Sequence, residues 1–417
     1  MTNFNPVETH IAKFLSKFPR VKQNIKKLYQ FLNYLLYKKK YVFDSQYLIN
    51  LVVKDKNESF FGYYDKSPVN NSNTYIVFHE ADNHSTSKLP NPHKPVNIVL
   101  HNIKDNTYEV ISSSPSYNWQ QGTKLQWLTD NKFIYNDLEN EKYISKIYNI
   151  ENKAFVTINF PIYDCYKEEF ALSLDFNRLN TLNTDYGYRN SLTEPDLENI
   201  KDDGIFYVDL RTNKVELLIS IEKIIDLHNK ENMIGAKHTF NHIMLSPDGQ
   251  NFIFIHRWYQ SGVRYDSLIS SNIEGTKITV LADNDMVSHC CWYNNTTIVG
   301  YLRDGKFGDN FYKIDIIAST KELLSKKLKN FGDGHPSFHK NKMLFDSYPD
   351  RSRMQHLYIY NMDNDSIEEI GEFHESLKYY GETRCDLHPR WSNDGKQIFI
   401  DSTHEGKRNL YSTNFNK

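Results

Sequence analysis

Four histidines recur along the chain at the spacing of a structural repeat. His242, His289, His335 and His388 lie 47, 46 and 53 residues apart, and each is followed three positions later by a large apolar residue. Imidazole binds borderline divalent metals and titrates near neutral pH, so clustered histidines could hold a metal or act as a general base. They could instead join loops within each repeat by hydrogen bonds. The pattern leaves both roles open.

The repeat length predicts the architecture that positions these histidines. A period of about 40 to 50 residues is typical of a four-stranded propeller blade. Three looser units precede the four regular ones and begin at Gly62, Gly122 and Phe170, the third with an insertion across residues 180–203. Seven units predict an all-β, seven-bladed β-propeller, which closes on itself and protects its strand edges. We expect residues 45–55 to supply the missing fourth strand of the last blade.

In a propeller the innermost strand of each blade runs beside the central channel. Residues repeated at the start of that strand should therefore meet around the axis at one mouth of the channel. We expect His242, His289, His335 and His388 to form such a partial ring, contributed by four consecutive blades. The candidate site residues are those that lie near this expected ring in the sequence or at the corresponding place in another unit.

Arginines and tyrosines near these histidines suit recognition of an acidic sugar. Guanidinium groups hold carboxylates through paired hydrogen bonds, and aromatic rings stack against sugar rings. Any one of these side chains could equally be an ordinary loop residue. The candidates are His238, Arg384, Asp386 and Arg390, with Tyr63, Tyr64 and Asp65 in the first unit and Arg351 and Arg353 in the sixth.

The bulk properties narrow the partners and the compartment. The chain has 417 residues and a net charge of −2, which gives no bias toward nucleic acid. Its four cysteines are too few and too irregular for a disulfide framework, so we expect reduced thiols. No apolar run is long enough to span a membrane, and residues 1–8 lack the features of a secretory signal. The expected location is the cytoplasm.

The first 45 residues differ from the rest of the chain. Residues 11–40 contain nine basic side chains and no acidic ones, with apolar residues at helical spacing. Pro19 should divide this stretch into two helices. We predict a basic amphipathic extension over residues 1–45, followed by the propeller over 46–417. The extension either lies peripherally on an anionic membrane, at its inner face, or docks on the propeller with its lysines in water.

Several motifs together resemble a known family. LSPDG, HPRWSNDGKQIFIDS and GHPSFHKNKMLFDSYPD resemble the TolB-type propeller repeat. A larger set over roughly residues 58–415 resembles bacterial propellers grouped with the oligogalacturonate lyases, including members associated with surface polysaccharides. That set comprises GYYDKSP, LSLDFNRLNTLNTDYGY, KHTFNH, VSHCCW, GDGHPSF, YPDRSRMQHLYIY, RCDLHPRWS and DSTHEG.

The resemblance implies a channel-mouth site with one divalent metal, manganese being the expected ion. Lyases of the group hold manganese with three histidines and a glutamine, and use a histidine base and an arginine to cleave uronic-acid linkages by elimination. Carried over by position, the metal ligands are His289, His335 and His388. The base is His238 or His242, and the arginine that neutralises the substrate carboxylate is Arg384 or Arg390.

The chain departs from the family pattern at two positions. Cys385 and Asp386 stand where a glutamine would precede His388, and Arg390 stands where a further histidine ligand would follow. Lyase activity is therefore open, and two functions fit. One is an enzyme acting on an acidic oligo- or polysaccharide, with elimination favoured because hydrolysis normally uses two carboxylates. The other is a non-catalytic carbohydrate- or protein-binding propeller in capsule or surface-polysaccharide biosynthesis, which the basic extension favours.

Overall fold

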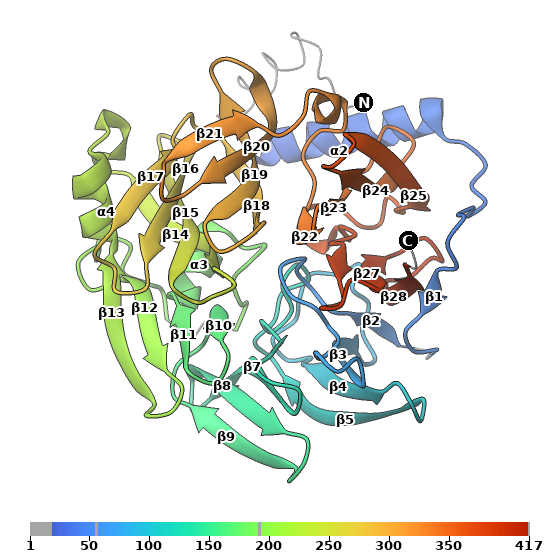
Figure 1. Ribbon diagram of the computed structural model, residues 1–417, viewed down its shortest axis with the longest axis horizontal. Coiled ribbons are helices and arrows are strands. Elements are labelled where there is room, and N and C mark those ends of the chain that lie inside the picture. Colours follow the sequence, from blue (N-terminus) through green and yellow to red (C-terminus); the bar gives the residue numbers. More distant parts are fainter. Residues whose placement is uncertain (1–18, 55–56, 191–192, 416–417) are drawn as a thin grey trace.

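A computed structural model describes residues 19–54, 57–190 and 193–415, and Figure 1 shows their sheets arranged as a ring around a central axis. Within this part of the chain seven four-stranded antiparallel sheets follow one another. The first strands of neighbouring sheets contact each other near the axis, as β18 (Val287–Trp292), β22 (Ser337–His339) and β26 (Arg390–Trp391) do in turn. The predicted seven-bladed all-β propeller is confirmed.

Blades 1 to 3 contain the irregular part of the ring. Blade 1 is β2 (Glu58–Phe60), β3 (Tyr75–Ala81), β4 (Val96–Asn102) and β5 (Thr107–Ser114). Blade 2 is β6 (Gln126–Trp127), β7 (Lys132–Glu139), β8 (Lys142–Asn149) and β9 (Ala154–Ile158). Blade 3 is β10 (Asp164–Tyr166), β11 (Phe170–Ser173), β12 (Gly204–Asp209) and β13 (Lys214–Ser220).

Blades 4 to 6 continue the ring, and blade 4 contains two strands of ten residues each. Blade 4 is β14 (Lys237–Leu245), β15 (Asn251–Gln260), β16 (Val263–Asn272) and β17 (Ile278–Ala282). Blade 5 is β18, β19 (Thr297–Asp304), β20 (Gly308–Asp315) and β21 (Thr320–Leu323). Blade 6 is β22, β23 (Lys342–Asp346), β24 (Met354–Asn361) and β25 (Ser366–His374).

Blade 7 closes the ring, because it combines three strands from the C-terminal part of the chain with one strand that precedes blade 1. It contains β26, β27 (Gln397–Ser402) and β28 (Asn409–Asn414), and its fourth strand is β1 (Asn50–Leu51). β1 pairs with β28 in antiparallel register, with Leu51 opposite Tyr411. The expected closure by residues 45–55 is confirmed. The segment that precedes blade 1 and the last strand of blade 7 therefore lie in one sheet (Figure 1).

Local turn chemistry explains the regular repeat. In blade 4 the Ser246 hydroxyl donates to Asp248, whose carboxylate also accepts from the Gln250 amide. Blade 7 repeats this arrangement with Ser392 and Asp394. A short polar side chain that binds nearby backbone favours a tight turn between two strands. The Ser-Pro-Asp-Gly and Ser-Asn-Asp-Gly motifs therefore mark the hairpin between the first and second strands of a blade.

Two predicted unit starts are wrong in detail. Blade 3 begins with β10 at Asp164, and Phe170 opens the second strand, β11. Blade 1 begins with β2 at Glu58, before Gly62. In both cases a short innermost strand precedes the residue predicted to start the unit, and neither strand carries the histidine that marks blades 4 to 7. The inserted connection in blade 3 carries helix α3 (Phe176–Leu182), capped by Asp175.

The remaining helices lie outside the sheets. α4 (Ile221–His228) follows β13 and is capped by Ser220, and three short 3₁₀ turns cover Glu231–Met233, Lys327–Asn330 and Gly381–Thr383. The predicted N-terminal helix is confirmed as α2 (Pro19–Tyr37), which begins at proline as helices often do. The expected helix before Pro19, with residues 11–18, lies outside the described residues.

The segment after α2 joins the helix to the propeller. Lys39 forms an ion pair with Glu372 at 2.6 Å, and the Tyr41 hydroxyl donates to the Glu372 carbonyl. Farther along, the Ser45 hydroxyl donates to the Ile370 carbonyl, so this segment runs along β25 toward β1. In the described part of the chain no helix is both long and apolar enough to cross a membrane. The boundary between residues 45 and 46 stays a prediction.

Candidate functional site

The four repeated histidines meet near the axis of the ring. The ring centroids of His289 and His335 are 4.0 Å apart, those of His335 and His388 are 4.4 Å apart, and those of His242 and His289 are 6.0 Å apart. All four side chains are buried. Imidazoles from blades 4 to 7 therefore form one continuous cluster.

Backbone irregularities occur at three of the four histidines. The pairing of β14 with β15 shifts register between Asn241 and Met244, and β18 with β19 shifts between Val287 and Cys290. A bulge of this kind turns a side chain away from the regular sheet face. His242 and His388 also have positive φ values, 53° and 44°, a conformation that histidine adopts more readily than most residues.

Hydrogen bonds fix the orientation of three imidazoles. The Nδ1 atom of His388 donates to the Gly62 carbonyl at 2.8 Å, and Nδ1 of His335 donates to the Asp346 carboxylate at 2.9 Å. Nδ1 of His289 lies 3.2 Å from Asp333. When Nδ1 carries the proton, Nε2 keeps a lone pair that can bind a metal.

Three side chains at the His335–His388 end of this cluster each have a ligand atom without a hydrogen-bond partner among the described residues. These atoms are His335 Nε2, His388 Nε2 and Asp386 Oδ1, and all three are buried. One ligand atom from each of these side chains can be chosen so that all lie within 4.8 Å of one another. Buried polar atoms normally have a partner, and two imidazoles with a carboxylate suit a divalent ion such as manganese. The residues present therefore fit the metal that the family resemblance implies.

Burial and neighbouring charges control the ionisation of the cluster. Burial, with help from nearby imidazoles and guanidinium groups, holds the pKa values of His242 and His388 well below the ordinary value. Burial opposes the charged form of His335, but the Asp346 carboxylate outweighs it and raises the pKa of His335. For Asp386, burial is outweighed by Arg384, which lowers the pKa of this carboxyl.

Two tyrosines from blade 1 fill the space between the histidines. The Tyr63 hydroxyl shares a 2.7 Å hydrogen bond with His242 Nε2, and its ring centroid lies 5.0 Å from that of His388. The Tyr64 hydroxyl donates to the Cys290 carbonyl. Both side chains are buried. The tyrosines therefore pack the axis between the histidines and leave the open space on one side of the cluster.

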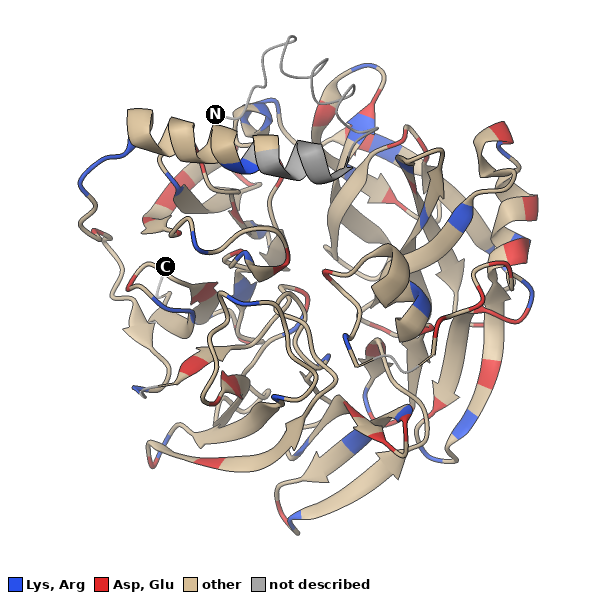
Figure 2. Ribbon diagram, turned by 180° about the vertical axis from the view of Figure 1, so that it is seen from behind, with Lys and Arg blue, Asp and Glu red and all other residues tan. Residues whose placement is uncertain are grey.

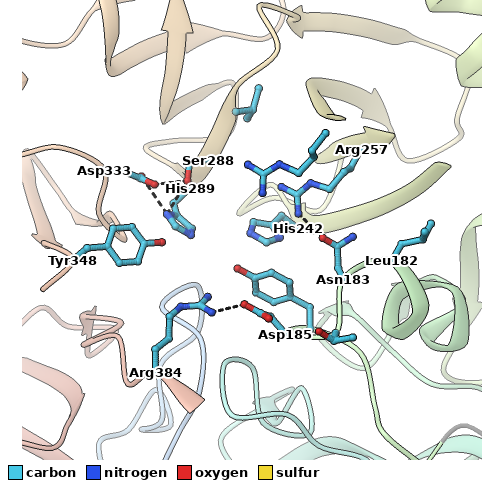
Figure 3. Close-up of a pocket in the computed structure, with 14 residues that line it drawn as sticks. Leu182, Asn183, Asp185, His242, Arg257, Ser288, His289, Asp333, Tyr348 and Arg384 are labelled. Atoms are coloured by element: carbon cyan, nitrogen blue, oxygen red, sulfur yellow. Dashed lines mark hydrogen bonds and ion pairs between the residues drawn. The ribbon is translucent and has the colours of Figure 1, made fainter. Parts of the chain in front are cut away.

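That open space is a pocket of about 400 Å³ at the mouth of the channel, shown in Figure 3. Its walls combine His242 and His289 with arginines, aspartates and tyrosines. The lining residues are Leu182, Asn183, Thr184, Asp185, Tyr186, His242, Arg257, Arg264, Val287, Ser288, His289, Asp333, Tyr348 and Arg384. Such a wall of mixed charge suits a polar ligand.

Arg384 connects the pocket wall to the candidate metal ligands. Its guanidinium pairs with Asp386 at 2.7 Å and also with Asp185 of the inserted connection in blade 3 (Figure 3 shows the Asp185 pair). Arg257 forms a buried ion pair with Asp266 at 2.5 Å and donates to Asn183 of the same insertion. These bonds hold the insertion against the pocket as part of its wall.

Several predicted site residues lie away from this pocket. His238 bonds to His256 at 3.0 Å in the sheet of blade 4, and Arg390 is buried with its guanidinium on Asp401 and two backbone carbonyls. Both side chains are held within the framework. The structure does not assign either of them to the pocket wall.

The remaining predicted substrate ligands are also elsewhere. Arg353 is buried against Glu375, and Arg351 contacts Tyr37 of α2. Asp65 lines a second cavity of about 450 Å³, whose other lining residues include the ends of the innermost strands, and it lies near Lys66 and Lys124. The sequence position of an arginine in a loop does not determine the direction of its side chain, so Arg351 and Arg353 could not be assigned to the pocket from the sequence. Guanidinium groups reach several ångströms from their backbone.

Sequence reasoning missed most of the supporting carboxylates. Asp333 lies two residues before His335 and Asp346 eleven residues after it, so only folding shows which imidazole each one holds. Lys124 was missed for a different reason. It precedes Trp127 by three residues, as His388 precedes Trp391, and it also has a positive φ, 57°. The shared spacing could have revealed it as the counterpart of the histidines in blade 2.

Comparisons with known proteins support the fold. No protein-family model and no curated protein matches the sequence. Oligogalacturonate lyase from Vibrio parahaemolyticus matches the structure with a TM-score of 0.62 and 13% identity, over 90% of this chain and 96% of that one. An oligogalacturonate lyase in complex with manganese matches with a TM-score of 0.63 and 14% identity over the same shares. TolB from Acinetobacter baumannii matches at 0.38 and 13%, over 78% and 77%, too distant to support an argument.

Those identities show a common fold and not a common activity. The expected likeness to the oligogalacturonate lyase propellers is confirmed at that level, since both lyase structures align over nearly their whole length. A propeller fold carries many functions. The activity of this chain therefore depends on the residues of its own pocket.

Proposed function

We propose that this propeller is a metal-dependent enzyme that cleaves uronic-acid-containing saccharides by β-elimination. The observation that carries the proposal is the set of three unpartnered, buried ligand atoms on His335, Asp386 and His388, next to a pocket with arginines in its wall. The likeness of the fold to a manganese-bound oligogalacturonate lyase supports manganese as the ion and an acidic oligosaccharide as the substrate.

The ligand set differs from the one expected from the family. His335 and His388 remain as predicted, and Asp386 takes the place left by the absent glutamine. The ring centroid of His289 lies 4.0 Å from that of His335, with the rings tilted by 44°, and His289 lines the pocket, so it is assigned to the pocket wall and not to the ligand set. A divalent ion held there supplies positive charge against a substrate carboxylate as that group gains enolate character.

His242 is the proposed general base. Its ring lines the pocket, and a hydrogen bond from Nε2 to the Tyr63 hydroxyl would leave the lone pair on Nδ1, which has no partner among the described residues. Nδ1 would take the proton from the carbon next to the carboxylate. The new double bond then forms as the glycosidic carbon–oxygen bond breaks, and the departing oxygen takes a proton from water.

Arg264 is the arginine best placed to receive the substrate carboxylate. Its side chain is 52% exposed, and it pairs at 3.3 Å with Asp266, which Arg257 also neutralises. Arg384 is already paired with two carboxylates, so its role in the proposal is to hold Asp386 and the insertion. A guanidinium that is open to water can form a bidentate pair with an incoming carboxylate at small cost.

The test is elimination activity on oligogalacturonate with manganese present, followed by the ultraviolet absorbance of the unsaturated uronate. We expect product from the full chain and a loss of at least about 100-fold for His242→Gln, because removing a general base costs that much. His339→Gln, a half-buried histidine of blade 6 outside the pocket, is the control and should keep full activity. Full activity of His242→Gln would contradict the assigned base.

A second function has an observation in its favour. The guanidinium nearest the ligand set, that of Arg384, is occupied by Asp185 and Asp386, and Tyr63 fills the centre of the histidine cluster. Both features suit a rigid binding module, such as a non-catalytic propeller in capsule or surface-polysaccharide biosynthesis. No product from metal-loaded protein, with acidic saccharide still bound, would favour this function over the lyase.

A further inference from the structure

Helix α2 presents an apolar stripe to solvent. The sequence pattern predicts that residues spaced three and four apart along this helix share one face, which in a globular protein is normally buried. In the structure that face points away from the propeller, and its large side chains are between 43% and 79% exposed. They are Ile25 at 43%, Leu28 at 59%, Leu32 at 49%, Leu35 at 46% and Leu36 at 79%.

The opposite face of α2 makes the contacts with the propeller. The Lys27 ammonium lies 4.1 Å from the ring centroid of Tyr380, and the Tyr34 ring lies 6.3 Å from that of His374. At the end of the helix Arg351 contacts the Tyr37 hydroxyl at 3.3 Å. The helix is thus held by a polar and aromatic face, and its apolar stripe remains uncovered by the described residues.

Charge on and beside the helix has one sign. Residues 20–40 contain seven lysines and arginines and no acidic residue. Lys38, Lys39 and Lys40 follow the helix directly and are exposed. Figure 2 shows blue and no red on the part of the helix that it colours, and blue at the start of the segment that leaves it. An exposed apolar stripe beside cationic side chains is complementary to a surface with an anionic outer layer over an apolar interior.

We propose that α2 binds the protein to an anionic lipid membrane surface, lying in the plane of the interface. The leucine stripe would enter the boundary between headgroups and acyl chains, while the lysines reach the lipid phosphates. A second copy of the chain is a poorer occupant, because two such helices would bring like charges together. The proposal adds a location to the proposed function and does not depend on the pocket.

Vesicle flotation of the full chain tests the proposal. We expect the protein to float with phosphatidylcholine vesicles that contain phosphatidylserine, to stay in solution with phosphatidylcholine alone, and to be released by salt. The double variant Leu32→Asp/Leu36→Asp should bind at least about tenfold more weakly, because two exposed apolar contacts are lost. Failure of the unaltered protein to float with anionic vesicles would overturn the proposal.

Matched variants separate the helix from the rest of the surface. Ile234 and Ile317 are 74% and 69% exposed on the propeller, so Ile234→Asp/Ile317→Asp is the control for the leucine variant and should bind like the parent. Equal weakening by both pairs would contradict the proposal. So would a dimer that forms without lipid and is broken by Leu32→Asp/Leu36→Asp, since the stripe would then be a contact between copies.

A second pair of variants isolates the charge. Lys38→Glu/Lys40→Glu should weaken flotation by about tenfold or more, since each lysine near an anionic surface contributes to binding. Lys153→Glu/Lys201→Glu changes two lysines of the propeller whose side chains are 69% and 73% exposed. It carries the same change in net charge and should bind like the parent. Equal loss in both pairs would mean that overall charge, and not the helix, attracts the lipid, which overturns the proposal.

Discussion

The two halves of the ring use the same backbone position for different purposes. Blades 4 to 7 place a histidine within the innermost strand or just before it, and the four imidazoles form one cluster. Blades 1 to 3 instead contribute Tyr63 at the axis, a lysine at the same spacing, and the insertion that walls the pocket. The repeat of the blade therefore determines where this side chain lies, while the residue type at the position varies between blades.

This asymmetry produces a one-sided site. The candidate metal ligands come from blades 6 and 7 alone, while Tyr63 and Tyr64 of blade 1 pack between the histidines. A catalytic metal site keeps at least one position open, whereas a closed ring of protein ligands is typical of a structural site. The histidine half is thus suited to bind an ion. The other half, through the insertion of blade 3, forms part of the wall of the pocket.

The largest expected effect breaks the histidine half directly. His335→Ala or His388→Ala should weaken manganese binding to the metal-free protein by at least about 100-fold, because each removes a ligand atom. Calorimetric titration measures the affinity. His339→Gln, whose ring lies outside the ligand set, should titrate like the parent. Unchanged affinity in both alanine variants would place the metal elsewhere or nowhere.

The next effect tests whether the other half depends on packing. Gly122 has a φ of +58°, and a Cβ there would lie 2.2 Å from a carbon of the His79 ring. Gly122→Ala should lower the free energy of unfolding by about 2–4 kcal/mol, through backbone strain and the clash together. Gly262→Ala has similar backbone strain, φ +78°, and open space around it, so urea unfolding should show a loss of only about 1 kcal/mol. Equal losses would show that packing around Gly122 is loose.

A smaller effect sharpens the role of the supporting carboxylates. Asp346 accepts from Nδ1 of His335 and from the backbone amides of His335 and His388, so it orients both imidazoles. Asp346→Asn should weaken manganese binding by about 10- to 100-fold, as loss of such an orienting group typically does. Asp363→Asn, in an exposed turn of blade 6, is the control. An affinity equal to that of the parent would mean that packing alone orients the rings.

The smallest effect tests the connection between the halves. Tyr63→Phe removes the hydrogen bond to His242 and should lower the free energy of unfolding by about 1 kcal/mol, with manganese affinity unchanged. Tyr75→Phe on β3 should change stability by less than about 0.5 kcal/mol. Chemical unfolding with and without manganese measures both quantities. A large loss of metal affinity in Tyr63→Phe would show that blade 1 takes part in ligation.

Much of the architecture could be predicted from the sequence because it repeats. Turn motifs and the apolar residue three positions after each histidine mark four blades, and the closure by β1 follows from a strand that the last blade lacks. The starts of blades 1 and 3 were misplaced because their innermost strands lack the histidine that marks blades 4 to 7. Such strands are specified by their neighbours in the ring more than by their own pattern.

The site was less predictable than the fold. Convergence of the histidines follows from the ring, but the direction of a long side chain does not, so Arg351 and Arg390 turn away from the pocket. Asp386 was a candidate near the histidines and a departure from a family pattern, but it was not predicted as a metal ligand, and its carboxylate proves to lie beside His388. The exposed stripe of α2 likewise could not be predicted, since periodicity shows that one face is apolar and not which face docks.

The central claim is that His335, Asp386 and His388 form a metal site beneath the pocket. The most direct measurement is an anomalous difference map from a crystal grown with manganese, collected where manganese scatters anomalously. We predict one peak within bonding distance of His335 Nε2, His388 Nε2 and an Asp386 oxygen, and its absence in His388→Ala crystals. A well-ordered map with these three side chains in place and no peak between them would contradict the claim.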